Sequence, residues 1–393
     1  MKKQKCFTLK QFEHVFELNE ITKIEIMNTT KGELDNFRME RGENTMRHSI
    51  AITMGDPSGI GAEIAIKALG DPKVYEQCQP IVIGDRLPME EAIGFTHSKL
   101  KLRIIHKPEE ALGQYGVIDL IDLGYMKAGS WEYKKVCKTS GAAAFRYIIL
   151  GIQLALEHKV DAVVTGPINK EAINLAGHHY SGHTEIFADF TGTKNYGMLL
   201  CSKQLKVIHV TTHVSMREAC DIIHNGQERI AEVITLADEV MRLLNIEKPR
   251  IAVAGLNAHS SENGLFGNEE EMAIVPAIVR CKQKGICVEG PVPPDTVFVK
   301  AIAGQYDVVV AMYHDQGHIP LKLNGFQLDT KTNQYTAMSG VNATVGLPII
   351  RTSVDHGTAF GKAGEGRANE ESLIEALEMA AVMAKKRFPI NQH

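Results

Sequence analysis

Short apolar runs alternate with polar or glycine-rich turns along most of the chain. Runs of strand length lie at 50–54, 80–84, 102–106, 117–123, 161–165, 207–210, 250–254 and 308–312. Residues 145–156 and 371–386 have the spacing of amphipathic helices. Buried strands that alternate with helices are typical of a mainly parallel α/β sheet. The pattern therefore predicts an α/β protein, with polar strand ends gathered at one edge of a sheet.

The first 45 residues do not share this pattern. They are charged, almost free of glycine and only loosely periodic, apart from a short helix that we expect near residues 9–18. A clean strand start follows Met46. We therefore expect residues 1–45 to be an extension outside the catalytic fold, or upstream sequence translated from an early start codon.

Composition narrows the class of protein. The chain has 393 residues, of which 44% are apolar and 23% charged, with a net charge of −4 and no long basic run. These values predict a globular protein that binds no nucleic acid. No apolar run approaches the roughly 18 residues of a membrane helix. The seven cysteines lie far apart, without a CxxC pair or a visible signal peptide, which predicts reduced thiols in the cytoplasm.

A glycine-rich turn follows the first strand, in the stretch MGDPSGIGAE. Gly55, Gly59 and Gly61 allow tight backbone and the close approach of another group. A strand–turn–helix of this kind points backbone N–H groups at an anion or a dinucleotide. It is not a GxGxxG fingerprint, so a purely structural turn explains it equally well.

Three of the apolar runs are followed within a few residues by a histidine: His213, His259 and His314. The carboxyl ends of parallel strands share one edge of a sheet, where ligands bind in α/β proteins. Three imidazoles at that edge would hold a divalent metal with one coordination position open, as in a catalytic site. Zinc suits imidazole, and cobalt, nickel, manganese or magnesium stay open. Each histidine alone would read as a hydrogen-bonded core or capping residue.

Groups suited to an anionic substrate surround these histidines in the sequence. Lys322 and Arg351 are cations that pair with phosphate or carboxylate. His183, Thr184 and Asn342 donate hydrogen bonds. Each of them, taken singly, is also compatible with an ordinary surface or capping role.

Together the motifs MGDPSGIGAE, TGPINK, SGHTE, TTH, GLNAH, PPDT, YHDQG and GVNATVGLPIIRTSVDHGTA resemble the 4-hydroxythreonine-4-phosphate dehydrogenase family. The resemblance covers residues 47–386 in unbroken order. It implies a two-domain fold like that of isocitrate and isopropylmalate dehydrogenases, with the active site in the interdomain cleft. We expect residues 46–170 and 300–393 to form the cofactor-side domain, and 171–299 the domain of the metal and dimer side.

The resemblance also implies roles for single residues. It makes His213, His259 and His314 the metal ligands, and Lys322 and Asp295 the catalytic residues. The expected substrate contacts are His183, Thr184, Lys322, Asn342 and Arg351. The expected cofactor contacts are Gly55, Gly59, Gly61, His356, Gly357 and Thr358. The resemblance further implies NAD, one divalent metal ion per subunit, a small phosphorylated substrate, and a homodimer whose subunits share each metal site.

Two departures from the family pattern stand out. The stretch LNGFQLDTKTNQYTAMSGV between Lys322 and Asn342 is longer than the usual family loop, and we expect it to be polar and exposed. Gly361 stands where the family often has a carboxylate that would hold the adenosine ribose and favour NAD over NADP. The motif HDQGHIPLK, with His318, is more similar to the branch acting on D-threonate or D-erythronate 4-phosphate than to the vitamin B6 branch.

The expected reaction is oxidation of a four-carbon 4-phosphorylated hydroxy acid, followed by decarboxylation. Lys322 would deliver a proton to the resulting enolate, with phosphate binding as its alternative duty. The vitamin B6 substrate, 4-phosphohydroxy-L-threonine, is the alternative within the family. A metal-dependent hydrolase or lyase, or a non-catalytic phosphosugar sensor, is the alternative from another class.

Overall fold

The computed structural model describes residues 47–329 and 334–390, and the chain divides into two compact units. Unit 1 contains residues up to Gly192 together with Gly357–Ala368 and the C-terminal residues from Phe388. Unit 2 contains Thr193–His356 and Asn369–Arg387. The predicted extension 1–45 and its helix near residues 9–18 lie outside the described residues.

Unit 1 is built on parallel strands in the order β3-β4-β2-β1-β5. The strands are β1 (Ser49–Thr53), β2 (Gln79–Gly84), β3 (Lys101–Ile105), β4 (Val117–Asp122) and β5 (Ala162–Thr165). The helices are α3 (Gly61–Ala68), α4 (Pro72–Gln77), α5 (Arg86–Phe95), α6 (Lys138–Leu156), α7 (Lys170–Leu175) and α8 (His183–Phe190), with 3-10 turns η1 (Pro108–Glu110) and η4 (Phe360–Lys362). β1 and β2 are buried along their whole length, as their unbroken apolar runs predict.

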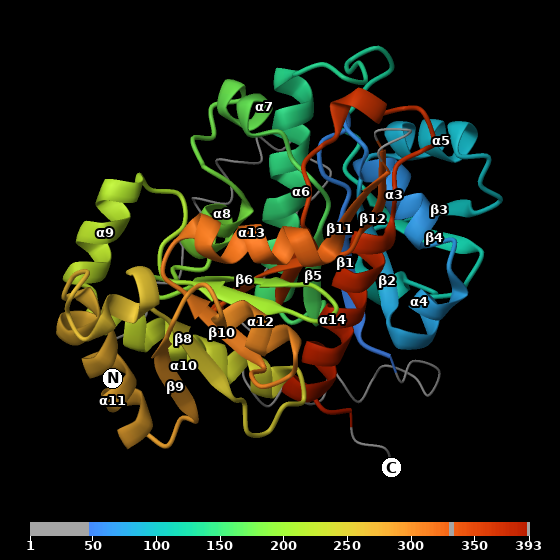
Figure 1. Ribbon diagram of the computed structural model, residues 1–393. Coiled ribbons are helices and arrows are strands. Elements are labelled where there is room, and N and C mark those ends of the chain that lie inside the picture. Colours follow the sequence, from blue (N-terminus) through green and yellow to red (C-terminus); the bar gives the residue numbers. More distant parts are fainter. Residues whose placement is uncertain (1–46, 330–333, 391–393) are drawn as a thin grey trace. The chain divides into compact units, whose positions relative to one another are not determined.

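The long helix α6 is the core helix of unit 1. By length and composition it would also suffice to cross a membrane, but it is mostly buried inside the protein. It packs on β1, β2 and β5 (Figure 1). Burial against the sheet therefore accounts for its apolar character, and it begins earlier than the helix predicted from residue 145.

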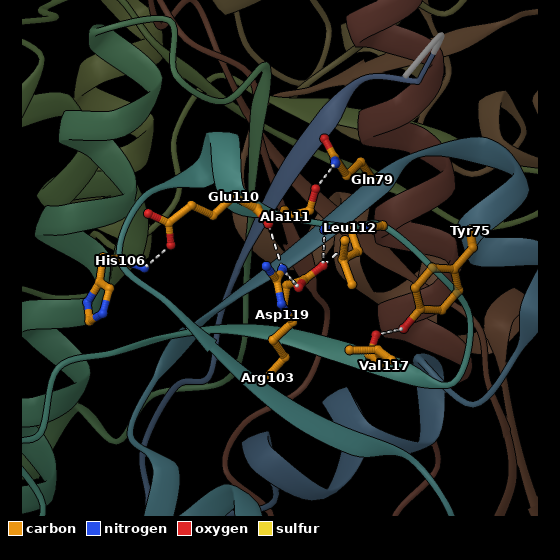
Figure 2. Close-up of polar contacts among 10 residues, drawn as sticks. Tyr75, Gln79, Arg103, His106, Glu110, Ala111, Leu112, Val117 and Asp119 are labelled. Atoms are coloured by element: carbon orange, nitrogen blue, oxygen red, sulfur yellow. Dashed lines mark hydrogen bonds and ion pairs between the residues drawn. The ribbon is translucent and has the colours of Figure 1, made fainter. Parts of the chain in front are cut away.

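A buried carboxylate organises the edge of unit 1. Asp119 of β4 accepts hydrogen bonds from the backbone N–H groups of Leu112 and Gly113, at 2.8 and 3.0 Å, and from Arg103 at 2.9 Å. Figure 2 shows these contacts, with Gln79 donating to the Ala111 carbonyl beside them. Since a buried charge is costly unless it is paired, the three donors explain an aspartate in the buried middle of β4.

Unit 2 has strands in the order β14-β13-β6-β7-β10-β8-β9. The strands are β6 (Gly197–Cys201), β7 (Lys206–His209), β8 (Ile251–Ala254), β9 (Val288–Val292), β10 (Val308–Ala311), β13 (Val341–Val345) and β14 (Arg351–Val354). The helical segments are α9 (Met216–His224), α10 (Gln227–Leu243), η2 (Ala258–Glu262), η3 (Glu270–Ile274), α11 (Val275–Gln283), α12 (Val297–Ile302), α13 (His314–Gly325) and α14 (Glu371–Arg387). Strands β7, β10, β8 and β9 run parallel, whereas β6, β13 and β14 pair antiparallel.

The two units differ from the expected domain boundaries. Residues 171–192 belong to unit 1, whereas residues 300–356 and Asn369–Arg387 belong to unit 2. The physical reason lies in strand pairing: β10 pairs with β7 and β8, and β13 pairs with β6, so this part of the chain joins the sheet of unit 2. Such long-range pairing leaves no mark in local hydrophobic spacing.

The long stretch between Lys322 and Asn342 contains a two-stranded hairpin. Its strands β11 (Phe326–Asp329) and β12 (Gln334–Met338) pair antiparallel, with an irregularity between Gln327 and Leu328. The hairpin forms a sheet of its own. It directly follows α13, the helix that begins at His314.

Candidate functional site

Three neighbouring parallel strands of unit 2 bring the predicted metal ligands to one sheet edge. β10 lies between β7 and β8, with Ala311 opposite His209 and Val310 opposite Val253. The three histidines follow these strands, as the sequence predicted: His213 after β7, His259 after β8 and His314 after β10. Their common edge is a consequence of the strand order.

His213 and His314 come together at this edge. Their ring centroids are 6.0 Å apart, which two metal–nitrogen bonds of about 2 Å can span. The Nδ1 of His314 donates to the Asp315 carboxylate at 2.6 Å, so its Nε2 is the nitrogen left for a ligand. Metal-binding histidines commonly carry such a carboxylate on the second nitrogen. This pair of imidazoles therefore fits one half of a divalent metal site.

His259 stands apart from this pair. It is exposed, on the turn η2, where five consecutive residues from His259 to Asn263 have left-handed backbone with φ between 47° and 66°. For a residue with a Cβ, the left-handed backbone conformation costs about 1–2 kcal/mol, and residues strained in this way are common at functional sites. Within the described residues, no three His, Cys, Asp or Glu side chains are arranged to hold a metal. A single chain therefore presents two of the three predicted ligands together.

Helix α13 continues the site along one face. His318 lies one turn after His314, and the two rings stack with centroids 3.6 Å apart. The Nδ1 of His318 lies 2.9 Å from the His314 carbonyl. A carbonyl only accepts, so this nitrogen carries the proton. Lys322, one turn further, completes the face.

A buried histidine lies beneath this helix. His209, at the end of β7, has its ring centroid 4.8 Å from that of His318. A Cβ added at Gly317 would lie 2.3 Å from the His209 Nε2, so only glycine lets α13 approach β7 this closely. Burial lowers the pKa of His209 to about 3 and, as the largest cause, that of His318 to about 4. Both rings are therefore neutral at physiological pH.

Lys322 does not face the site as a lone cation. Its Nζ forms an ion pair with the Asp355 carboxylate and donates to the Asp355 backbone carbonyl at 3.1 Å. The ring of Phe326 lies beneath the ammonium, with its centroid 4.3 Å away. The sequence predicted Lys322 as a cation near His314. It did not predict the ion pair, because Asp355 is distant from Lys322 in the chain.

The β13–β14 ladder brings Asn342 and Arg351 onto one face. Asn342 lies opposite Ser353, and Thr344 opposite Arg351, so the four side chains share that face. Arg351 is 2% exposed and donates to Thr344 Oγ1 at 3.0 Å. The Asn342 Oδ1 is buried and has no hydrogen-bond partner among the described residues, as expected of a group that meets a ligand.

The other predicted substrate contacts belong to different parts of the chain. His183 and Thr184 are the first residues of α8 in unit 1, and the first turn of a helix suits an anion. The preceding loop is held by His178, whose ring stacks on Phe145 at 3.6 Å. Asp295 lies in unit 2, in a groove of about 650 Å³ between α12 and α13 that it lines together with Asp315 and Gln316.

The glycine turn after β1 has internal reasons for its glycines. A Cβ at Gly61 would lie 1.9 Å from the Met54 carbonyl oxygen, and one at Gly55 would lie 2.4 Å from that of Pro167. A Cβ at Gly59 would lie 2.9 Å from the Cβ of Thr358, and the Ile60 N–H donates to the Thr358 carbonyl at 3.2 Å. The turn thus holds the segment that carries the other predicted cofactor contacts. Direct binding of a cofactor by the three glycines stays a prediction.

Asp56 in this turn is fully buried. Its Oδ1 accepts the Ser58 N–H at 2.8 Å, while its Oδ2 has no partner within the described part of the chain. Burial raises the pKa of Asp56 from 3.8 to about 6. The protonated acid therefore favours the folded state, and this stability is lost as the pH rises from 3.8 to about 6.

Asp56→Asn is expected to stabilise the protein more at about pH 7.5 than at about pH 4, because it removes a carboxylate that ionises unfavourably. The difference between the two pH values should reach about 2–3 kcal/mol in the free energy of unfolding. Urea unfolding at both values measures it, with the exposed Glu90→Gln as the control. An Asp56→Asn variant whose stabilisation is the same at both pH values would contradict the buried-acid interpretation.

Several residues of the site were not singled out from the sequence. Gln316 ties two strand ends together: its Oε1 accepts the Met312 N–H at 2.6 Å, and its Nε2 donates to the Gly255 carbonyl at 2.8 Å. His209 and Asp355 were also missed. The stretch VIHVTTH contains a second histidine, His209, four residues before His213, and this was a signal that could have pointed to it. The partners of Gln316 and Asp355, in contrast, depend on tertiary contacts.

The parallel strand ends, the paired imidazoles and the lysine on α13 define an α/β enzyme with a polar site at the carboxyl edge of its sheet. Residues 76–380 match the family "Pyridoxal phosphate biosynthetic protein PdxA". The match covers well over half of the chain, and this protein belongs to that family.

Named relatives agree with this placement. The chain is 47% identical to D-threonate 4-phosphate dehydrogenase from Cupriavidus necator, over 86% of this chain and 98% of the relative. It is 46% identical to the enzyme of the same name from Salmonella typhimurium, over 86% and 99%. The crystal structure of 4-hydroxythreonine-4-phosphate dehydrogenase from Klebsiella pneumoniae has 45% identity and a TM-score of 0.76, covering 87% of this chain and 99% of that one. The homologues are dehydrogenases, so an oxidoreductase is supported.

Proposed function

We propose that this protein is an NAD-dependent, metal-dependent dehydrogenase that acts on D-threonate 4-phosphate or D-erythronate 4-phosphate. It oxidises the C3 hydroxyl and releases the carboxyl group as carbon dioxide, giving dihydroxyacetone phosphate. The observation that carries this proposal is the row formed by His213, His314 and Lys322, with two imidazoles meeting at a strand edge and an ammonium two turns along α13. The names of the two relatives supply the substrate.

The residues present fit a divalent cation, with zinc as the first choice and magnesium, manganese or cobalt as alternatives. His213 and His314 would hold it, and Asp315 orients the His314 ring. When bound, the cation would lower the pKa of the substrate hydroxyl and polarise the new ketone, while nicotinamide accepts the hydride.

The side chains of this protein have three tasks in that reaction. Arg351, Asn342, His183 and Thr184 bind the phosphate and carboxylate and so orient C3. Lys322 delivers the proton to the carbon that loses the carboxyl group, as carbon dioxide leaves. Asp295 is a further candidate for proton transfer, on the basis of the family motif.

We infer that a second copy of the chain supplies His259. The exposed, strained turn η2 displays this histidine to solvent, and its strain is compatible with a role outside its own chain. A homodimer with a shared site would complete the three-histidine set. Leu265 and Phe266 on the same loop are 72% and 49% exposed, which suits a surface that another copy covers.

For the nicotinamide cofactor we propose the segment from His356 to Thr358. A Cβ at Gly357 or Gly361 would meet no described atom within 4 Å, so the backbone is open to a ligand there. Gly361 offers no carboxylate to the ribose, so the preference for NAD rests on family membership. The six cysteines of the described residues form no disulfide, which supports a reducing, cytoplasmic location.

The second candidate substrate is 4-phosphohydroxy-L-threonine, favoured by the name of the Klebsiella pneumoniae structure. The two substrates differ chiefly at C2, where one has a hydroxyl and the other an amino group. Purified protein with NAD and a divalent metal should reduce NAD faster with threonate 4-phosphate than with phosphohydroxythreonine. The reverse order would move the protein to the vitamin B6 reaction.

The same assay tests the proposals from other classes. A hydrolase or lyase would consume a phosphorylated acid without reducing NAD, and a sensor would bind it without turnover. Reduced nicotinamide and released phosphate, measured in parallel on both substrates, separate these outcomes.

A further inference from the structure

The ammonium group of Lys322 is enclosed by groups from unit 2. The Asp355 carboxylate and backbone carbonyl accept its hydrogen bonds, and the Phe326 ring lies beneath it. A carboxylate and an aromatic face both attract an ammonium and restrict its direction. The Lys322 side chain is 33% exposed and that of Asp355 is 11% exposed. The charge is therefore fixed on the protein side and accessible on the other.

Asp355 is itself held by helix α14. Its backbone N–H donates to Ser372 Oγ at 3.1 Å, and the same hydroxyl donates to the Gly340 carbonyl at 2.6 Å. A Cβ at Gly340 would lie 3.1 Å from the Asp355 Oδ2. Gly340 also donates its N–H to Glu375 at 3.0 Å. These contacts leave Asp355 little freedom to turn away from Lys322.

The hairpin β11–β12 begins and ends at this ion pair. Phe326 is its first residue, and Ser339 and Gly340 follow its last strand. At the base of the hairpin the Ser339 N–H donates to the Gly325 carbonyl at 3.2 Å, and a Cβ at Gly325 would lie 2.5 Å from the Ser339 carbonyl oxygen. The long insertion thus contributes contacts to Lys322 at one end and to Asp355 at the other.

We propose that Asp355 is the positioning residue for Lys322, and that the base of the β11–β12 hairpin holds the pair through Phe326 and Gly340. The proposal deepens the proposed function and rests on it for the reaction in which Lys322 acts. Because Asp355 offsets the charge of Lys322, a phosphate dianion gains less from this lysine than from an unpaired one. The pair therefore favours proton delivery over phosphate binding as the duty of Lys322.

The test compares Asp355→Asn, Lys322→Ala and the double variant. If Lys322→Ala lowers kcat, Asp355→Asn should also lower kcat, by about 10-fold. The kcat of the double variant should be no lower than that of Lys322→Ala alone. Phe326→Leu keeps an apolar side chain without the ring face and should lower that constant by about 2-fold to 5-fold. Glu371→Gln is the matched control, since Glu371 pairs with the exposed Lys203 from the same helix α14.

Three results would overturn the proposal: wild-type constants in Asp355→Asn, effects of the two single variants that multiply in the double variant, or a change in KM alone where Lys322→Ala changes kcat. Thermal unfolding of each variant separates a lost contact from a lost fold.

A second readout needs no substrate. Labelling of Lys322 by an amine reagent, followed by mass spectrometry, should become about 10-fold faster in Asp355→Asn, because the amine is then no longer held by the carboxylate. Glu371→Gln should leave it unchanged. If the wild type turns over neither substrate, the proposed function fails while labelling still tests the pairing. Unchanged labelling in Asp355→Asn would overturn the inference even in an active enzyme.

Discussion

His314→Ala is expected to abolish turnover and to lower the divalent metal bound per subunit, while the fold survives. The imidazole pair with His213 is the one part of the predicted metal site that a single chain assembles. Loss of a residue that only orients a metal ligand lowers metal affinity or activity by about 10-fold to 100-fold. Loss of a ligand itself should therefore lower activity by more than about 100-fold. Metal analysis and steady-state rates measure the effect, and the exposed His106 provides a control alanine variant.

Mixing variants tests whether a second copy supplies His259. His259→Ala and His314→Ala should each be inactive alone. In a mixed dimer, one site takes His213 and His314 from one subunit and His259 from the other, and is intact. Random pairing of equal amounts should therefore restore about one quarter of the wild-type activity. Dimers that form without any recovery would place all three histidines in the site of one chain.

Lys322→Ala is expected to separate the two halves of the reaction. Hydride transfer should continue, while release of carbon dioxide and protonation of the enolate slow by about 100-fold, the usual contribution of a positioned acid. Reduced nicotinamide would then form faster than carbon dioxide, and a keto acid would accumulate. Rapid-quench analysis of both products measures the ratio.

An exposed lysine offers the control for that experiment. Lys203 forms an ion pair with Glu371 on the surface of unit 2, and Lys203→Ala should leave both rates unchanged. A Lys322→Ala enzyme with a normal kcat and only a raised KM would remove Lys322 from proton delivery and leave it as a phosphate ligand.

Local sequence determined the strands of the sheet and the histidines that follow them. The apolar-rich runs 80–84, 102–106 and 117–123 are the strands β2, β3 and β4 to within a residue or two, because short runs rich in apolar residues favour strands. Of the three, β2 is buried along its whole length, whereas β3 has exposed residues. The positions of His213, His259 and His314 after their strands followed from the same runs. Family motifs supplied the substrate contacts that no spacing could define.

Tertiary structure decided what those residues contact. The antiparallel strands β6, β13 and β14 and the hairpin β11–β12 depend on pairing between distant segments, which hydrophobic spacing does not encode. The same holds for the ion pair of Lys322 with Asp355 and for the packing of Gly317 on His209.

The metal site shows the division most clearly. The sequence by itself determined that each of three imidazoles follows a strand, since each strand is recognisable from its own residues. Only the tertiary structure decided that the strands are neighbours, that His213 and His314 meet, and that His259 lies exposed on a left-handed turn. The physical reason is that strand order and loop conformation depend on contacts between residues far apart in the chain, whereas strand formation depends on residues that are adjacent in it.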